Sequence, residues 1–504
     1  MTTKLSFRNS LPFIAIALLG IYLRLLFLNK NDLWYDEVWT LITAKESLIH
    51  INPPFYFIFI KLWIRIFGIS EFALRLPSVL FSFGSLLITY LIGKELFGRR
   101  VSFYALTIIG LSPFHLWYAQ EARHYSFALL LGLTSSYFLL LWLKKRNLKY
   151  VLLYALFSTL SIYTHYFCIF LVFSQILSAL IFSNLNWRKS LLPLFPLLFF
   201  LPWISIFTSK IISFQKGFWI AKPTLKSLLI TFENLILGYN GTETLYFLNN
   251  FLILILVIVF IFKIAQKKIL IQELFYCLIL SFLPIATAFV FSQYFNSVYL
   301  DRCFLFFTPY FYISLSYIIS KIEYKIFRVS VLTMILALLI LSDINYFSNK
   351  IYNKNNAQHH TGTYVKQPYK PLADFLRNNS VEKNYIIFTH LNAMAPLGYY
   401  LALPEERFFS FSLFAFDPNI NDTATQRPYQ EVYKGIGFFV PKENLLNRLN
   451  DANKKIFFIG CDWARSGALD ENSISIKLFL YKYFILKEQL NFDGIKVFIY
   501  EHRN

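Results

Sequence analysis

The chain has few cysteines and no repeating unit, and each shortage disfavours a class of protein. Its 504 residues include four cysteines, which are widely spaced and show no metal-ligand spacing. We therefore expect them to be unpaired and structural. No period recurs along the chain, which disfavours a transporter built from repeated units. No small-residue cleavage site follows the first apolar run, residues 11–28, so this run is predicted to be a retained anchor.

What the chain has in abundance is apolar surface. Hydrophobic residues make up 57% of the sequence, which is too high a share for an ordinary soluble protein of this length. The formal net charge of +20 could indicate nucleic-acid binding. However, the basic residues form small clusters between apolar runs, which is the pattern that orients membrane helices. The sequence thus predicts a polytopic membrane protein that binds no nucleic acid.

The apolar runs predict about eleven membrane crossings, because a helix needs about 20 residues to span the bilayer. Basic clusters between the runs all fall on one side of this topology, which is expected to be cytoplasmic. The opposite face then carries the loop after the first span and the C-terminal tail. The predicted spans are residues 11–28, 72–92, 101–118, 124–143, 150–164, 166–182, 191–208, 251–264, 269–291, 303–320 and 330–341.

Two adjacent carboxylates, Asp36 and Glu37, follow the first span on the predicted outer face. Inside the hydrocarbon each charge would cost about 2.5–3.5 kcal/mol, so we expect both side chains to lie just outside it. The same loop continues through His50, the tandem prolines Pro53 and Pro54, and Tyr56. Because tandem prolines stiffen the chain, the segment after them is predicted to be an amphipathic helix in the membrane interface.

A second polar cluster connects two predicted spans and contains Gln120, Glu121, Arg123 and His124. If this connection is helical, Gln120, Arg123 and His124 share a face. His165 lies at a predicted outer turn, where a histidine could also simply satisfy a helix end. Arg302 begins another span on the same face and is either a phosphate ligand or a snorkelling anchor.

These residues suggest a reaction in which a carboxylate takes a proton while arginines hold an anion. A lipid-linked sugar phosphate fits both requirements. Asp36 or Glu37 would act as the base for an acceptor hydroxyl that attacks the anomeric carbon. Arg123 and Arg302, with His124 beside them, would stabilise the departing phosphate, which needs positive charge more than it needs an acid.

The order of these motifs resembles the GT-C membrane glycosyltransferases, in particular the protein-mannosyltransferase-like enzymes that use polyprenyl-phosphate sugars. The residues that carry the resemblance are Asp36–Glu37, Pro53-Pro54-Phe55-Tyr56, Arg75-Leu76-Pro77-Ser78 and Gln120-Glu121-Ala122-Arg123-His124-Tyr125-Ser126. They lie within about the first 130 residues. Each motif alone is weak, and four in order are fairly specific.

The resemblance implies an inverting glycosyltransferase with Asp36 at the catalytic acidic position and Glu37 as its neighbour. It also implies that Arg123 helps to bind the donor, with Arg302 a looser match. Glu121, Tyr56, His50 and His165 are further candidates for substrate binding. Members often have a histidine directly before the paired prolines, whereas this chain has Asn52 there and His50 two residues earlier. Some GT-C enzymes use a divalent metal at the acidic pair; here metal dependence stays open.

The predicted fold is therefore an α-helical GT-C membrane domain, residues 1–345 with a first outer loop at 29–71, followed by an extracytoplasmic α/β domain, residues 346–504. Short apolar runs at 385–389, 455–459 and 495–500 are predicted strands. The expected location is a prokaryotic inner membrane, and the acceptor is a lipid, a glycan or a protein. The main alternative function is a lipid-linked sugar flippase or transporter, which would place its charges near the bilayer midplane.

Overall fold

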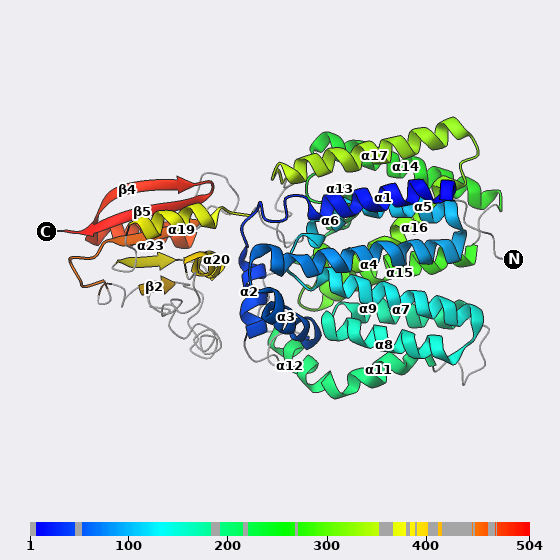
Figure 1. Ribbon diagram of the computed structural model, residues 1–504, viewed down its shortest axis with the longest axis horizontal. Helices are drawn as coiled ribbons and strands as arrows, with labels where there is room; N and C mark the ends of the chain where they lie inside the picture. Colours follow the sequence, from blue (N-terminus) through cyan, green and yellow to red (C-terminus); the bar gives the residue numbers. More distant parts are fainter. Residues whose placement is uncertain are drawn as a thin grey trace. The chain divides into compact units, whose positions relative to one another are not determined.

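The computed structural model describes most of the chain and divides it into two units (Figure 1). One unit consists of residues 1–28 and 48–363, and the other of residues 29–47 and 364–504. The segment that carries Asp36 and Glu37 therefore clusters with the C-terminal residues and not with the helices on either side of it. The described residues are 7–45, 53–182, 192–214, 220–267, 271–351, 366–379, 384–388, 391–401, 412–415, 446, 449–461, 469 and 471–503.

The first unit is helical. Within its described residues it contains, in chain order, α1 (Phe7–Leu25), α3 (Pro54–Phe67), α4 (Glu71–Phe97), α5 (Arg99–Gly110), α6 (Pro113–Ala119), α7 (Tyr125–Lys145), α8 (Leu148–Thr164), α9 (Cys168–Phe182), η1 (Leu192–Leu194), α11 (Phe195–Phe200), η2 (Leu201–Trp203), α12 (Ile204–Phe214), α13 (Leu225–Leu237), α14 (Glu243–Ala265), α15 (Ile271–Tyr294), η3 (Asp301–Phe306), α16 (Thr308–Ser320) and α17 (Lys325–Phe347).

Six helical segments in the described part of the chain are long and apolar enough to cross a membrane. They are Glu71–Phe97, Tyr125–Lys145, Leu192–Ser209, Glu243–Ala265, Gln272–Tyr294 and Lys325–Phe347. Shorter apolar helices cover Ile14–Leu25, Leu148–Thr164 and Cys168–Ile181. The chain is an integral membrane protein by these segments, as its composition predicts.

Prolines divide several of the predicted spans. The span predicted at 101–118 is two helices, because α5 ends at Gly110 and α6 restarts at Pro113. The hydroxyl of Ser112 accepts a hydrogen bond from the backbone N–H of His115 and so caps the new helix. The prediction of one continuous helix here is wrong because hydropathy alone does not register a cap followed by proline.

A fully buried arginine stabilises the end of α5. Arg24 of α1 donates hydrogen bonds to the carbonyl oxygens of Ile109 (3.0 Å) and Gly110 (2.8 Å), which are among the last carbonyls of the helix. It also donates to Ser82 of α4 at 2.7 Å. One side chain thus joins three helices and satisfies carbonyls that the helix break would otherwise expose.

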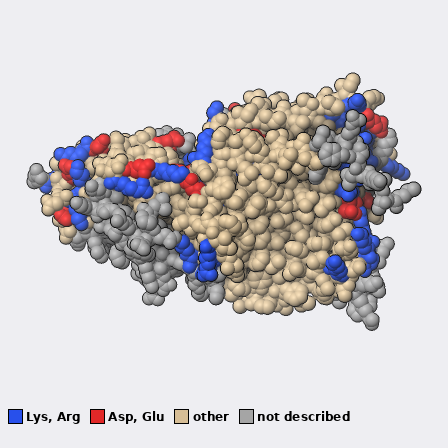
Figure 2. Space-filling model, viewed as in Figure 1, with Lys and Arg blue, Asp and Glu red and all other residues tan. Residues whose placement is uncertain are grey.

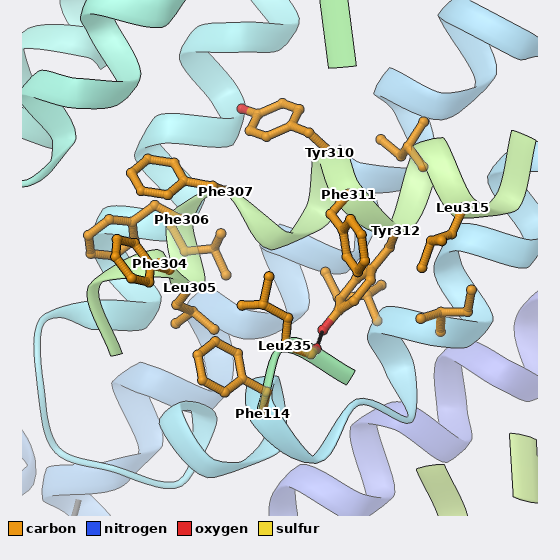
Figure 3. Packing of buried hydrophobic residues seen from close by; sticks show 14 of the residues in the cluster. Phe114, Leu235, Phe304, Leu305, Phe306, Phe307, Tyr310, Phe311, Tyr312 and Leu315 are labelled. Carbon is orange, nitrogen blue, oxygen red and sulfur yellow. Dashed lines mark hydrogen bonds between the residues drawn. The ribbon is translucent and has the colours of Figure 1, made fainter. Parts of the chain in front are cut away.

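Aromatic side chains from η3 and α16 fill the centre of the first unit (Figure 3). Phe304, Phe306, Tyr310 and Tyr312 are buried there. The hydroxyl of Tyr312 donates to the carbonyl of Leu235 in α13, and it lies 3.0 Å from the hydroxyl of Ser112. This packing fixes η3, which carries Arg302, against the ends of neighbouring helices.

The basic clusters of the first unit gather at shared helix ends. Lys144, near the end of α7, lies 3.5 Å from Glu95, near the end of α4. Lys263 of α14 lies 3.0 Å from Glu323, which precedes α17. Figure 2 shows a broad area without charged residues over the helices of this unit, with Lys and Arg toward both ends of this area. An uncharged band between charged ends is typical of a domain that spans a membrane.

The second unit is a mixed α/β structure. Its described elements are α2 (Tyr35–Lys45), α19 (Tyr369–Asn378), β1 (Tyr385–Phe388), α20 (Leu391–Leu401), β2 (Ser412–Ala415), β3 (Ile456–Cys461), α23 (Glu471–Tyr483), β4 (Phe484–Phe492) and β5 (Ile495–His502). The strand order is β2-β1-β3-β5-β4. Strand β1 pairs in parallel with β2 and β3, whereas β5 pairs antiparallel with β3 and β4. The predicted strands correspond to β1, β3 and β5, so the C-terminal mixed fold is confirmed.

Candidate functional site

The predicted site residues fall into two groups, one in each unit. Asp36 and Glu37 belong to the second unit, while Tyr56, Glu121, Arg123, His124, His165 and Arg302 belong to the first. His50 lies outside the described residues.

Asp36 and Glu37 occupy the first turn of α2, where a carboxylate interacts favourably with the positive end of the helix dipole. Their burial differs: the side chain of Glu37 is fully buried, whereas Asp36 is partly exposed. The Oε2 atom of Glu37 accepts a hydrogen bond from the backbone N–H of Trp34 at 3.4 Å and lies 3.7 Å from the Nζ atom of Lys366. The adjacent carboxylates therefore have different environments, and Asp36 is the one open to solvent.

The segment before α2 is also held by residues of the C-terminal part. Asp32 accepts a hydrogen bond from the backbone N–H of Lys370 at 2.7 Å, and its carboxylate lies 3.4 Å from the ammonium of that lysine. The backbone N–H of Leu33 donates to the hydroxyl of Tyr400 in α20 at 2.7 Å. No pattern in the sequence predicted these partners, because Lys370 and Tyr400 lie more than three hundred residues after Asp32 and Leu33.

In the first unit, Arg123 and Arg302 gather around one aromatic ring. Their guanidinium carbons lie 6.0 Å and 5.9 Å from the ring centre of Tyr125, which is buried at the start of α7. Cation–π contacts of this kind stabilise a guanidinium group where water is scarce. The two arginines that were predicted to hold a phosphate thus lie close together, although they come from elements far apart in the sequence.

Two imidazoles complete this arginine–histidine cluster, by which we mean Arg123, His124, Tyr125, His165 and Arg302. The ring centres of His124 and His165 are 4.6 Å apart. The backbone N–H of Phe167 donates to Nδ1 of His165 at 3.1 Å, so the proton of the neutral ring resides on Nε2. Tyr56 of α3 packs against His124 with 5.8 Å between ring centres.

Both histidines are held neutral. Burial, together with the smaller effects of the charges of Arg302 and Arg123, lowers the pKa of His165 to about 3. Burial likewise holds the pKa of His124 well below its usual range, with Arg123, His165 and Arg302 adding to the effect. The imidazoles therefore add hydrogen-bonding capacity to the cluster without adding charge, and the positive charge resides on the two arginines.

Two residues that precede Arg123, Gln120 and Glu121, form hydrogen bonds within the helical unit. The segment Gln120–His124 is not helical, because α6 ends at Ala119 and α7 begins at Tyr125. The condition under which Gln120, Arg123 and His124 would share a helical face is therefore not met. The amide of Gln120 donates to the carbonyls of Leu23, Arg24 and Leu26 at the end of α1. Glu121 is buried, and its carboxylate accepts a hydrogen bond from the indole of Trp117 at 2.9 Å.

Asp301, the neighbour of Arg302, bonds within the bundle. Its carboxylate oxygens accept hydrogen bonds from Thr231 at 2.6 Å and Asn234 at 2.7 Å. Burial raises the pKa of Asp301 and these two hydrogen bonds partly oppose the rise, so that the pKa is about 7. The carboxylate therefore anchors η3 to α13, which positions the arginine that follows it.

The acidic pair does not form a complete metal centre with the residues that the structure describes. Within those residues, no group of three or more histidine, cysteine, aspartate or glutamate side chains could hold an ion. Zinc and calcium sites generally take several such ligands, whereas Mg²⁺ is commonly held by one or two carboxylates together with substrate phosphate and water. The carboxylate of Glu37 lies instead beside the ammonium of Lys366.

Part of the chain matches a known protein family. Residues 51–209 match the family model described as dolichyl-phosphate-mannose-protein mannosyltransferase, and this stretch includes Arg123, His124 and His165. The comparison with curated proteins found no match.

Solved structures share the fold over nearly the whole chain. ArnT from Cupriavidus metallidurans bound to undecaprenyl phosphate superimposes with a TM-score of 0.61 at 12% identity, covering 97% of each chain. The apo oligosaccharyltransferase of Archaeoglobus fulgidus gives a TM-score of 0.52 at 13% identity, covering 99% of this chain and 75% of that one. These matches and the family model confirm the resemblance to the GT-C membrane glycosyltransferases that the sequence predicted.

Proposed function

We propose that this chain, a membrane glycosyltransferase of the GT-C kind, transfers a sugar from a polyprenyl-phosphate donor to an acceptor hydroxyl at the outer face of the membrane. The acceptor is a lipid, a glycan or a protein. The location is a prokaryotic inner membrane. The six helical segments of the described residues that are long and apolar enough would span it, which is fewer than the eleven crossings that hydropathy predicts.

The observation that carries the proposal is the convergence of Arg123 and Arg302 on Tyr125. Two guanidinium groups gathered among aromatic rings and neutral imidazoles form a strongly cationic cluster, which favours an anion with several oxygen acceptors. A phosphodiester on a lipid has this chemistry. ArnT, whose fold this chain shares, has been solved with undecaprenyl phosphate bound, which supports the same donor class here.

The place of the cluster along α7 supports an outer-face reaction. Arg123 and His124 directly precede α7, whereas Lys144 and Lys145 end it. A helix of 21 residues is about 30 Å long, which matches the hydrocarbon thickness. If the lysine-rich end is cytoplasmic, the arginine–histidine cluster belongs to the outer face.

The proposed reaction is a single displacement at the anomeric carbon. Asp36 takes the proton of the acceptor hydroxyl, whose oxygen forms the new bond to that carbon. The bond between the carbon and the phosphate oxygen breaks, and polyprenyl phosphate leaves with both electrons. Arg123 and Arg302 stabilise the charge that develops on it, and Nε2–H of His165 is a further donor. Attack opposite to the leaving group inverts the configuration of the sugar.

Phosphorus NMR on proteoliposomes tests this proposal against the alternative of a lipid-linked sugar flippase. The purified full chain is supplied with a panel of polyprenyl-phosphate sugars and a mixture of acceptor lipids and glycans. We expect one member of the panel to change from a phosphodiester signal to a phosphomonoester signal as the sugar leaves. A flippase would move the donor across the bilayer with its phosphodiester intact, and that result would overturn the proposal.

A further inference from the structure

The acidic pair contains a buried ion pair that joins distant parts of the chain. Glu37 is fully buried, and its Oε2 atom lies 3.7 Å from Nζ of Lys366, whose side chain is 10% exposed. A buried carboxylate is costly unless a cation and hydrogen bonds compensate for the lost water. Here the ammonium of Lys366 and the backbone N–H of Trp34 provide this compensation.

A second ion pair close by differs in its exposure. Lys370 lies 3.4 Å from Asp32, but its side chain is 42% exposed. Exposed ion pairs contribute little to stability, since water screens them. The two lysines are four residues apart and both contact carboxylates of the segment that leads into α2, so they form a matched pair for comparison.

We propose that the ammonium of Lys366 is the cation of the acidic pair, a role that a divalent metal takes in some related enzymes. It keeps Glu37 ionised and fixes the first turn of α2, so that Asp36 alone faces the acceptor as the base. The inference rests on the proposed function, and it makes Lys366 a positioning residue. The C-terminal unit then contributes to catalysis through this side chain.

The physical consequence of removing the ammonium follows from the burial of Glu37. The carboxylate would have to take up a proton or move toward water, and either change would disturb the helical turn that carries Asp36. A displacement of about 1 Å at a reacting group can cost about a hundredfold in rate. Donor binding, which we assign to the arginine–histidine cluster, would be unaffected.

The test measures kcat and donor KM for the full-length protein in proteoliposomes, with the donor identified by phosphorus NMR. For Lys366→Met we expect kcat to fall by about ten- to a hundredfold, with donor KM within about threefold of the wild type. Lys366→Arg keeps the cation and is expected to retain most of kcat. Lys370→Met, the matched control, is expected to stay within about threefold of the wild type. EDTA is expected to leave the wild-type rate unchanged.

Several results would overturn the inference. They are a wild-type kcat in Lys366→Met, a Lys366→Arg variant as slow as Lys366→Met, or a rate lost in EDTA and restored by Mn²⁺ or Mg²⁺. If Lys366→Met does not fold, Lys366→Gln, which keeps a hydrogen-bond donor but no charge, takes its place with the same expectation. Failure of the proposed function is distinguishable, because the wild-type protein would then turn over no polyprenyl-phosphate sugar at all.

Discussion

The two units stabilise their functional charges by different means. In the second unit, carboxylates are held by lysines: Glu37 by Lys366 and Asp32 by Lys370. In the first unit, Arg123 and Arg302 are held among aromatic rings and neutral imidazoles, with Tyr125 at their centre. An ion pair compensates a buried charge with an opposite charge, whereas an aromatic ring stabilises a cation through the negative face of its π-system. We propose that the first cluster binds substrate, while the second positions a base.

The largest effect is expected at Asp36. Asp36→Asn keeps the shape of the side chain but removes the base, so transfer should fall by about a thousandfold. The matched control is Asp32→Asn, which changes a carboxylate four residues earlier that contacts Lys370. We expect the transfer rate of this control to fall by less than about tenfold, because the lysine of its ion pair is exposed to water. Initial rates of sugar transfer at saturating donor provide the measurement.

Equal transfer rates for Asp36→Asn and the wild type would contradict the role of Asp36 as the base. The partly exposed carboxylate would then have no chemical role, and the base would have to come from elsewhere.

The next largest effect is expected in the arginine–histidine cluster. Arg123→Met and Arg302→Met should each lower kcat/KM by about a hundredfold, because each removes a cation from the departing phosphate. The matched control is Arg146→Met at the other end of α7. Arg146 also makes a cation–π contact, with its guanidinium carbon 5.6 Å from the Trp142 ring, so the same kind of contact is lost there.

Rates for Arg146→Met should stay close to those of the wild type. If all three variants were impaired alike, the loss would reflect the cation–π contact itself and not a role in binding phosphate.

The smallest effect concerns the neutral histidines. Because the pKa of His165 is lowered to about 3, the unfolded chain binds more protons than the folded one at any pH between this value and about 6.5. Stability should therefore fall as the pH drops below about 6.5, by at most about 1.4 kcal/mol per pH unit for this group. His165→Asn removes the titrating ring, so its melting temperature should fall less between pH 7 and pH 5. Identical pH slopes for both proteins would contradict a neutral His165.

Much of the fold could be predicted because local patterns determine it. Hydropathy located the six helical segments of the described residues that are long and apolar enough to span a membrane, although it predicted eleven spans. The turn predicted at His165 separates α8 from α9. The tandem prolines begin α3, since Pro53 precedes the helix and Pro54 is its first residue. The breaks within spans were missed: Ser112 and Pro113 restart a helix inside a continuous apolar run, and hydropathy averages over such a feature.

The site could be predicted only in part, because its partners are distant in sequence. Asp36, Arg123 and Arg302 stood out as charges beside apolar runs. Tyr125, which brings the two arginines together, resembled any aromatic residue at a membrane interface. Lys366 resembled any solvated lysine in a polar domain, and only the folded chain places it beside Glu37. Glu121 accepts a hydrogen bond from the indole of Trp117, and its role in substrate binding stays a prediction.

Binding of the lipid carrier, measured separately from transfer, tests the central claim most directly. Native mass spectrometry can count undecaprenyl phosphate bound to the purified wild type, to Asp36→Asn and to the double variant Arg123→Met/Arg302→Met. If the arginine–histidine cluster binds the donor and Asp36 acts only in the chemistry, Asp36→Asn should bind the lipid like the wild type and the double variant should not. Undiminished binding by the double variant, or loss of binding in Asp36→Asn alone, would contradict the account.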